Sequence, residues 1–374
     1  MNSIEIVRQG DNWTYASGPT HQLDTWEPYL CLLERSGMLD GRHAFVHCTN
    51  QYPINDIDQL FPWNFWRELV RRKRGQQMIV IFDSHTEGVS WRHVSRTVNR
   101  MLFHDGIDPR CVVQWTGGSH EPDSPIQTVT VMDAFSLISW PQYCMPASPR
   151  HHFVMLARIP KPHRIAAAVA ILDRGLEAHG FMSCGSGSHG TFDRKAFEHV
   201  PTQHRHRFPL LLPGDSVNHV QTVPYTIEST TRSEVTGAFC SVIPETSHDL
   251  MAPNVCTAFM TEKSEKCFLL EQVPIWIAAS GQAALAREWG FDVFDDIIDH
   301  GYDLEPDPYK RTEMAADQLA LLCAQPISKW QQYKLDNQER FMRNRTLCME
   351  LRATHPELQY RKLVDCIARM PAVG

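Results

Sequence analysis

The stretch that most constrains the fold runs from Thr261 to Arg311. It opens with Thr261-Glu262-Lys263 and continues into an apolar run, Phe268–Ala279. A turn at Gly281 and a short helical pattern follow, and then the acidic segment Gly290–Asp296. This succession predicts a helix, a buried strand, a turn, a second helix, a short strand and an acidic loop, which together form half of an open α/β sheet.

Two charged side chains, Glu262 and Lys263, stand at the predicted start of the first of these helices. Parallel α/β sheets bind phosphates and ribose at helix N-termini beside the sheet, so the pair is well placed for a nucleotide. The alternative is that both side chains belong to a solvated helix start. Glu265-Lys266 forms a second such pair one turn further on.

Length and composition indicate an ordinary globular protein with two domains. The chain has 374 residues, of which 43% are apolar and 21% charged, and its net charge is −7. An acidic whole gives no general attraction to nucleic acid, although a local basic groove is compatible with it. The 11 cysteines show no Cys-x-x-Cys spacing. We therefore expect reduced thiols in a cytoplasmic protein, with neither a signal peptide nor a membrane span.

The first 150 residues alternate between strand and helix patterns. Strands are predicted at 41–48, 78–82, 111–115 and 128–132, and helices at 64–74 and 90–103. Pro141, Pro146 and Pro149 then punctuate the chain, so a domain boundary is expected near residue 150.

A polar loop, Asp83–Gly88, directly follows the predicted strand at 78–82. Loops at the carboxyl ends of parallel strands carry the ligand sites of open sheets. Asp83, His85 and Glu87 are therefore candidates for the group that deprotonates an acceptor hydroxyl. The alternative is a helix N-cap, because Asp83 is a good capping residue.

The second half opens with a strand, Phe153–Ala157, and a loop rich in cations before a helix predicted at Ile165–Ala178. Its cationic residues are Arg158, Lys161, His163 and Arg164. A diphosphate is well held between a strand and a helix N-terminus, by free N–H groups and arginine. A plain basic turn is the alternative, but cations there oppose the helix dipole.

Several further segments have predicted roles. Ser183–Gly190 is glycine-rich but lacks the P-loop pattern, and His204–Arg207 is expected to be a solvated segment rather than a metal site. A strand at Gly237–Ile243 leads to Glu245, a candidate donor contact with a plain loop carboxylate as the alternative. Long helices are predicted at Glu313–Cys323 and Ser328–Ala353.

These motifs together resemble a known family. The motifs are Thr-Glu-Lys at 261–263, Pro-Ile-Trp-Ile at 274–277, Gly-Phe-Asp-Val-Phe-Asp at 290–295, Tyr-Asp at 302–303 and Arg311. The pattern resembles GT-B-like glycosyltransferases common in bacteriophages and surface-polysaccharide clusters, and Thr-Glu-Lys is also similar to the nucleotide-sugar site of bacterial fucosyltransferases. The chain departs from the family at Ala157, Lys161, Cys267 and His300-Gly301.

The resemblance implies an α/β fold in which two Rossmann-like domains face a cleft. Residues 1–150 would be the acceptor-side domain and 151–330 the nucleotide-sugar domain. The helices of 331–374 would pack back on the first domain. The implied activity is transfer of a sugar from a UDP- or GDP-sugar to an acceptor hydroxyl.

The resemblance also implies residue roles. The diphosphate would be held by Arg158, Arg164 and Lys263, with His163 helping. Glu262 would bind the ribose hydroxyls or hold Lys263, and Thr261 and Glu245 would contact the sugar or ribose. Tyr302 and Asp303 would line the donor pocket or only shape the loop. Asp83 or Glu87 would be the base of an inverting enzyme. No Asp-x-Asp motif ends a strand, so no essential metal is expected for the transfer.

Two acceptors and one competing class of function stay open. The acceptor would be a glycan or, since the resemblance extends to phage proteins, a hydroxymethylated pyrimidine of viral DNA in the host cytoplasm. The cations Arg71–Arg74 would then face the duplex, unless they only complement a helix dipole. The competing reading is a non-catalytic nucleotide- or nucleic-acid-binding protein, favoured by Ala157 and Cys267. The sequence does not give the oligomeric state.

Overall fold

The computed structural model describes thirteen stretches of the chain, and for the first three strands, residues 352–360, Thr130, Val364 and Ile367 it describes the backbone alone. The stretches are residues 5–8, 43–47, 79–84, 99–100, 102–118, 123–124, 126–130, 145–157, 159–185, 197–213, 231–246, 248–250 and 257–369. The chain divides into two compact units. Unit 1 comprises Met1–Ala134, Asn254–Thr257 and Thr354–Gly374, and unit 2 comprises Phe135–Pro253 and Ala258–Ala353.

Unit 1 contains a five-stranded parallel sheet in the order β1-β2-β3-β4-β5. Its strands are β1 (Glu5–Arg8), β2 (His43–His47), β3 (Ile79–Ser84), β4 (Val112–Thr116) and β5 (Gln127–Thr130). Every residue of β4 is buried, and Asp108 caps the short 3-10 turn η1 (Pro109–Cys111) before it. A strand that is buried on both faces is typical of parallel sheets.

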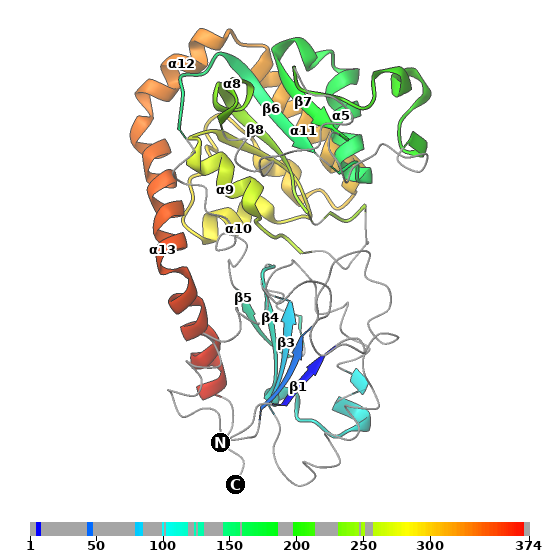
Figure 1. Cartoon of the computed structure of the whole chain (residues 1–374), viewed down its shortest axis with the longest axis vertical. Coiled ribbons are helices and arrows are strands. Elements are labelled where there is room, and N and C mark those ends of the chain that lie inside the picture. The colour runs from blue at the N-terminus through cyan, green and yellow to red at the C-terminus, as the bar shows by residue number, and fades with distance from the viewer. Residues whose placement is uncertain are drawn as a thin grey trace. The chain divides into compact units, whose positions relative to one another are not determined.

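Unit 2 contains a four-stranded parallel sheet in the order β7-β6-β8-β9 (Figure 1). Its strands are β6 (His151–Ala157), β7 (Gly180–Cys184), β8 (Ala238–Pro244) and β9 (Val273–Ile277). From β6 the chain moves to one side to form β7, and then returns past β6 to form β8 and β9. The strand order therefore reverses between β6 and β8.

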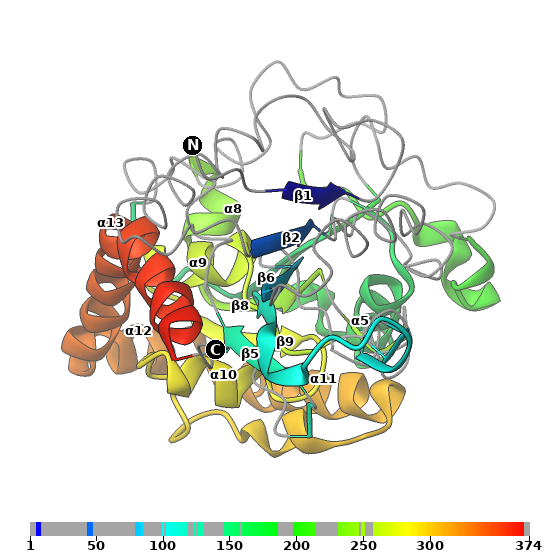
Figure 2. The same cartoon turned by 90° about the horizontal axis from the view of Figure 1, so that it is seen from below.

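Helices cover both faces of the unit 2 sheet. α5 (Pro162–Asp173) and α11 (Pro308–Cys323) pack on the face that carries Ile275 and Ile277. Trp276 points to the opposite face, where its indole Nε1 donates to Ser264 of α9 (Glu262–Leu269) at 2.9 Å. Figure 2 shows the strands of unit 2 with α9 and α11 on either side. The result is a three-layer α/β arrangement.

The remaining elements complete the two units. They are η3 (Leu176–His179), η4 (Thr202–Arg207), α8 (Ser233–Thr236), α10 (Gln282–Glu288), η5 (His300–Leu304), α12 (Ile327–Asp336) and α13 (Gln338–Ala368). Over the described ranges, no helix is both long enough and apolar enough to cross a membrane. The described cysteines are all free and buried, as expected of small core residues.

The predicted α/β class with parallel sheets is confirmed, whereas the GT-B-like arrangement around a cleft stays a prediction. The predicted strands at 41–48, 78–82, 111–115, 128–132, 153–157 and 237–243 correspond to β2, β3, β4, β5, β6 and β8. The buried strand inside Phe268–Ala279 corresponds to β9. The helix predicted at 64–74, with its cations Arg71–Arg74, lies outside the described residues.

One predicted element does not form, and two helical predictions are confirmed with different bounds. The short strand expected in Gly290–Asp296 does not form, because Asn344 of α13 bonds both the N–H and the carbonyl of Asp292, at 2.8 and 2.7 Å. The helix expected from Ile165 begins at Pro162, which suits a first helical position. The pattern at Ser328–Ala353 is two helices, which meet at Asn337.

Candidate functional site

The candidate site lies at the carboxyl edge of the unit 2 sheet, where the strand order reverses. The loops that leave β6 and β8 there lead to α5 and α9, which cover opposite faces of the sheet. In open parallel sheets, ligands bind beyond the carboxyl ends of the two strands that flank such a reversal. The residues that matter are therefore those after Ala157 and those after Pro244.

The N-terminus of α5 brings cations to this edge. Lys161 is the N-cap residue, and its side chain makes no capping hydrogen bond. The first turn contains no acidic residue, so no negative charge on the helix itself offsets the positive end of its dipole. His163 and Arg164 lie in this turn rather than in the loop that the sequence predicted, and both are buried. Nη1 of Arg164 donates to the carbonyl of Ile159 at 3.2 Å.

The loop after β8 holds the start of α9. The Glu245 carboxylate is fully buried and accepts hydrogen bonds from Thr261 N at 3.1 Å and from Ser264 Oγ at 2.6 Å. The Thr261 hydroxyl also donates to this carboxylate. Thr261 in turn caps the helix by accepting from Lys263 N at 3.3 Å. Glu245 is thus occupied in positioning the Thr261–Lys263 segment.

Cations from the two loops meet at Thr246. The ammonium of Lys161 donates to the Thr246 carbonyl at 3.4 Å, and that of Lys263 donates to the Thr246 hydroxyl at 3.3 Å. Lys263 Nζ also lies 2.8 Å from Glu262 Oε1 and 4.0 Å from Glu245 Oε2. The Lys263 side chain is 20% exposed, so solvent reaches it. Two separate segments therefore present positive charge at one place on the sheet edge.

The acidic partner of Lys263 is charged at any ordinary pH. Burial opposes ionisation of Glu262, but Lys263 and Lys266 outweigh it and lower the pKa of the carboxyl to about 2. Its side chain is 32% exposed and bonds only one oxygen to Lys263. Glu262 therefore keeps acceptor capacity for hydroxyl groups while it orients the lysine.

Two buried histidines near these cations stack on each other. The rings of His163 and His248 are parallel, with centroids 4.8 Å apart. His163 Nε2 donates to the Glu245 carbonyl at 2.9 Å, and His248 Nδ1 accepts from Leu250 N at 3.1 Å. Burial lowers the pKa of His163 well below its ordinary value, and burial with the nearby Arg311 lowers that of His248 to about 3. Both rings are neutral, and neither adds charge to the edge.

Tyr302 and Asp303, predicted to line the donor pocket, are occupied within the fold. The buried Tyr302 hydroxyl accepts from the N–H of Trp276 at 3.0 Å, which satisfies the free edge of β9. The Asp303 carboxylate accepts from the N–H groups of Gln282 and Ala283 at 3.0 and 2.9 Å, and so caps α10. Both side chains therefore support β9 and α10 from within the fold.

The remaining predicted residues are described in part or not at all. Arg158, His85 and Glu87 lie outside the described residues. Asp83 is described by its backbone, which lies in β3 in register with His47 and Trp115. It belongs to unit 1, whereas the cationic edge belongs to unit 2. The catalytic assignments to these three residues stay predictions.

The structure adds contacts that the sequence did not predict. Thr246 and His248 follow β8 closely, and both meet residues of the α5 turn. A strand end followed by polar residues is the signal that pointed to Glu245, and it would have included Thr246. Nothing in the sequence distinguishes His248 from the other histidines, since its partner lies on a distant segment.

Comparisons with known proteins give little further information. No family model matches the chain, and no curated protein matches it. Among solved structures, the chain is similar to a UDP-forming α,α-trehalose-phosphate synthase from Burkholderia xenovorans. The TM-score is 0.43 at 9% identity, over 92% of this chain and 72% of the other. A likeness this weak supports no conclusion about function, so we rely on the geometry of the sheet edge.

Proposed function

We propose that the chain is a glycosyltransferase that binds a nucleotide-sugar donor at the carboxyl edge of the unit 2 sheet. The observation that carries this proposal is the meeting of Lys161 and Lys263 at Thr246, beside the N-termini of α5 and α9. A diphosphate needs positive side chains, and this edge supplies them from two separate segments. Arg158, which precedes the α5 turn, is proposed to join them.

The proposed chemistry follows from where charge develops. Transfer breaks the bond between the sugar and the diphosphate, and the leaving diphosphate gains negative charge. Cations fixed at that position stabilise the transition state more than the bound donor. In this proposal Lys161, Arg164 and Lys263 supply the charge, while Glu245 positions Lys263 and Glu262 binds the ribose hydroxyls. No metal is assigned to the transfer step.

The acceptor side is proposed to lie on unit 1. Asp83 is the last residue but one of β3, near the carboxyl edge of a parallel sheet, where a carboxylate is suitably placed to take a proton from a hydroxyl. Glu87 is the second candidate for the base, and His85 lies between them. We propose a glycan or a hydroxymethylated pyrimidine of DNA as acceptor, and UDP or GDP as the nucleotide.

The donor site is tested by binding and turnover in matched lysine variants. Wild-type protein should be stabilised in thermal unfolding by one class among UDP-, GDP-, ADP- and CMP-sugars, because a ligand that binds the folded state raises its stability. Lys161→Ala and Lys263→Ala should each weaken this shift. Each should also reduce release of the nucleoside diphosphate by about 10²- to 10³-fold, the usual effect of removing one charge-stabilising group.

Lys310→Ala is the matched control, because Lys310 is 65% exposed and its ammonium pairs with Glu305 at 2.6 Å. This variant should keep wild-type binding and turnover. Equal nucleotide-sugar binding by wild type, Lys161→Ala and Lys263→Ala would remove the donor site. Binding without any release of nucleoside diphosphate, with either acceptor class present, would instead favour the non-catalytic nucleotide-binding protein.

A further inference from the structure

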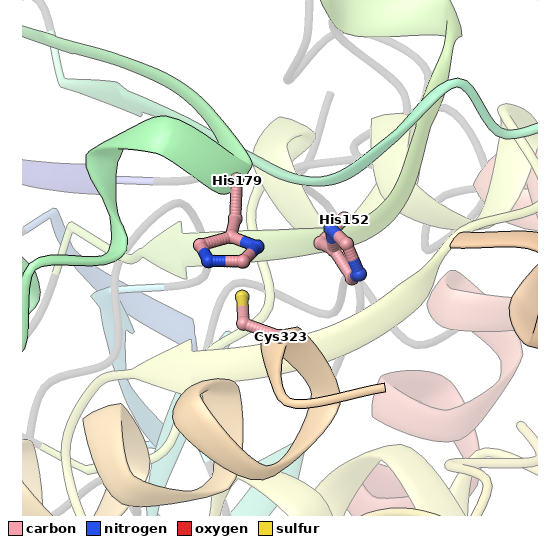
Figure 3. Close-up of side chains that lie close together, drawn as sticks. All are labelled: His152, His179 and Cys323. Carbon is pink, nitrogen blue, oxygen red and sulfur yellow. The ribbon is translucent and has the colours of Figure 1, made fainter. Parts of the chain in front are cut away.

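Three side chains with no assigned role converge at the amino end of β6. His152 is the second residue of β6, His179 ends η3 and Cys323 is the last residue of α11. One potential ligand atom from each lies within 4.8 Å of the other two (Figure 3). This cluster is at the end of the strand opposite to the cationic edge, so it is independent of the proposed donor site.

The hydrogen bonding of the cluster leaves ligand atoms available. His152 Nε2 lies 2.8 Å from the carbonyl of Gln325. A carbonyl only accepts, so Nε2 carries the hydrogen and Nδ1 has a free lone pair. Across the described part of the chain, neither the His179 ring nor the Cys323 thiol makes a hydrogen bond. Apart from His152 Nε2, these side chains therefore lie together without a hydrogen-bonding partner in the described part of the chain, and the two imidazole rings pack edge to face with their centroids 5.1 Å apart.

We propose that His152, His179 and Cys323 bind one Zn²⁺ ion, with water in the fourth position. Zinc prefers imidazole and thiolate in tetrahedral geometry, and three protein ligands plus water is an established arrangement. The hydrogen bond from His152 to a backbone carbonyl is the second contact that orients a metal-binding histidine. His179 is half-buried, which leaves a side of the cluster open to solvent for the water.

The geometry requires only small adjustments to close around an ion. Zn–N and Zn–S bonds of about 2.1 and 2.3 Å place tetrahedral ligand atoms about 3.4–3.7 Å apart. The present separation of up to 4.8 Å is closed by rotation of the half-buried His179 ring and the Cys323 thiol. Zinc binds cysteine as the thiolate, so the Cys323 thiol would release its proton to solvent as the ion binds.

The ion would connect parts of unit 2 that are distant in sequence. It would join the start of β6, η3 and the end of α11, and through Gln325 it would also reach the loop before α12. A ligand that binds only the folded protein stabilises it, so occupation of this site should raise the unfolding temperature of unit 2. The predicted effect on stability does not require any enzymatic activity.

The test uses cobalt and zinc on the full chain after treatment with a chelator. One equivalent of Co²⁺ should give a thiolate-to-cobalt charge-transfer band and the strong visible bands of tetrahedral cobalt, and Zn²⁺ should displace both. Cys323→Ala should lose the charge-transfer band. His179→Ala, at a half-buried position that leaves the core intact, should bind zinc about tenfold more weakly or worse.

Cys184→Ala is the matched control, because Cys184 is another free, buried cysteine of the same unit. It should keep the cobalt spectrum, and zinc should raise its unfolding temperature as in wild type. Absence of a thiolate band in wild type would overturn the proposal. An identical cobalt spectrum and zinc affinity in Cys323→Ala and His179→Ala would overturn it as well, since the ion would then bind elsewhere.

Discussion

The carboxylate of Glu245 organises the cationic edge through internal hydrogen bonds alone. Its two oxygens accept from Thr261 and Ser264, and Lys263 lies 4.0 Å away. A buried carboxylate is stable only when such donors surround it. The Glu245 side chain therefore fixes the positions of Thr261 and Lys263. In the proposed function, the nucleotide-sugar would contact those two residues rather than Glu245 itself.

The stacked pair His163 and His248 should make stability depend on pH. An unfolded histidine has a pKa near 6.5, whereas the folded pKa of His248 is about 3 and that of His163 is also well below 6.5. As pH falls below 6.5, the unfolded chain therefore binds protons at these two histidines while the folded chain does not. The contribution of the two neutral histidines to the free energy of unfolding is fully present above pH 6.5. It is lost as pH falls toward 3, by up to about 1.4 kcal/mol per pH unit for each histidine.

His248→Gln isolates this contribution, because the glutamine carbonyl still accepts from Leu250 N. The charged groups near the pair, Lys161, Arg164 and Arg311, remain in place. Between pH 7 and pH 5 the unfolding temperature of wild type should fall, and that of His248→Gln should fall less. His206→Gln, at an exposed position on η4, is the control and should follow wild type. An undiminished fall in His248→Gln would contradict the assignment.

Arg340 makes most of the side-chain ion pairs that join helix α13 to the acidic segment after α10. Arg340 Nε and Nη2 donate to the two oxygens of Asp292 at 2.7 and 2.9 Å, and Nη2 also donates to Asp296 at 2.8 Å. Burial opposes charge on Asp292, but these bonds hold the pKa of its carboxyl below the ordinary range. The guanidinium also lies 4.9 Å from the centre of the Phe294 ring. Such a paired fork is stronger than a simple ion pair.

Arg340→Ala should lower the free energy of unfolding of unit 2 by about 2–3 kcal/mol, because several charge-assisted hydrogen bonds are lost. Arg340→Lys should recover only part of this, since lysine keeps the charge but not the fork. Arg343→Ala is the control on the same helix: Arg343 is 64% exposed and only reaches Asp292 at 3.3 Å. It should change stability by less than about 0.5 kcal/mol in denaturant unfolding. Equal losses in Arg340→Ala and Arg343→Ala would contradict the proposed anchor.

The same segment shows why some elements were predictable and others were not. β6, β8 and β9 are short apolar runs between turns, which is a local pattern, and the sequence predicted each of them. Phe291, Val293 and Phe294 give a similar pattern, but Phe291 stacks on Phe268 at 4.0 Å and Asn344 takes the backbone hydrogen bonds of Asp292. The side chain that takes these hydrogen bonds in place of a neighbouring strand lies on a helix distant in sequence, so a local pattern does not reveal it.

For the molecule as a whole, the site residues were predictable from local patterns, whereas the convergence of cations from two loops was expected only from the family resemblance, and for Arg158, Arg164 and Lys263 rather than for Lys161 and Lys263. A cation before a helix and a Glu-Lys pair at a helix start are visible in the sequence. That Lys161 and Lys263 contact the same threonine follows from the strand order β7-β6-β8-β9, which places two loops of different chain regions side by side. Strand order is set by packing across the whole unit, and the sequence pattern does not encode it locally.

The division into units is likewise a property of the whole chain. Unit 1 is assembled from three separate segments, and its last segment begins at Thr354, within α13. Near the end of that helix, Leu363 is buried, and Cys366 Sγ donates to Gln127 Oε1 of β5 at 2.9 Å. A helix with continuous periodicity gives no sign that its two halves belong to different units.

Removal of residues 354–374 should therefore weaken unit 1 selectively. The truncation uncovers the Gln127 side of β5 and removes the buried Leu363, whose loss alone as Leu363→Ala should cost about 2–5 kcal/mol. In hydrogen exchange, the amides of β4 should lose protection while those of β6 and β8 keep it, because local stability follows local packing. Arg361→Ala, an exposed position on the same segment, is the control and should leave β4 protected. Full protection of β4 in the truncated chain would show that the end of α13 does not contribute to unit 1.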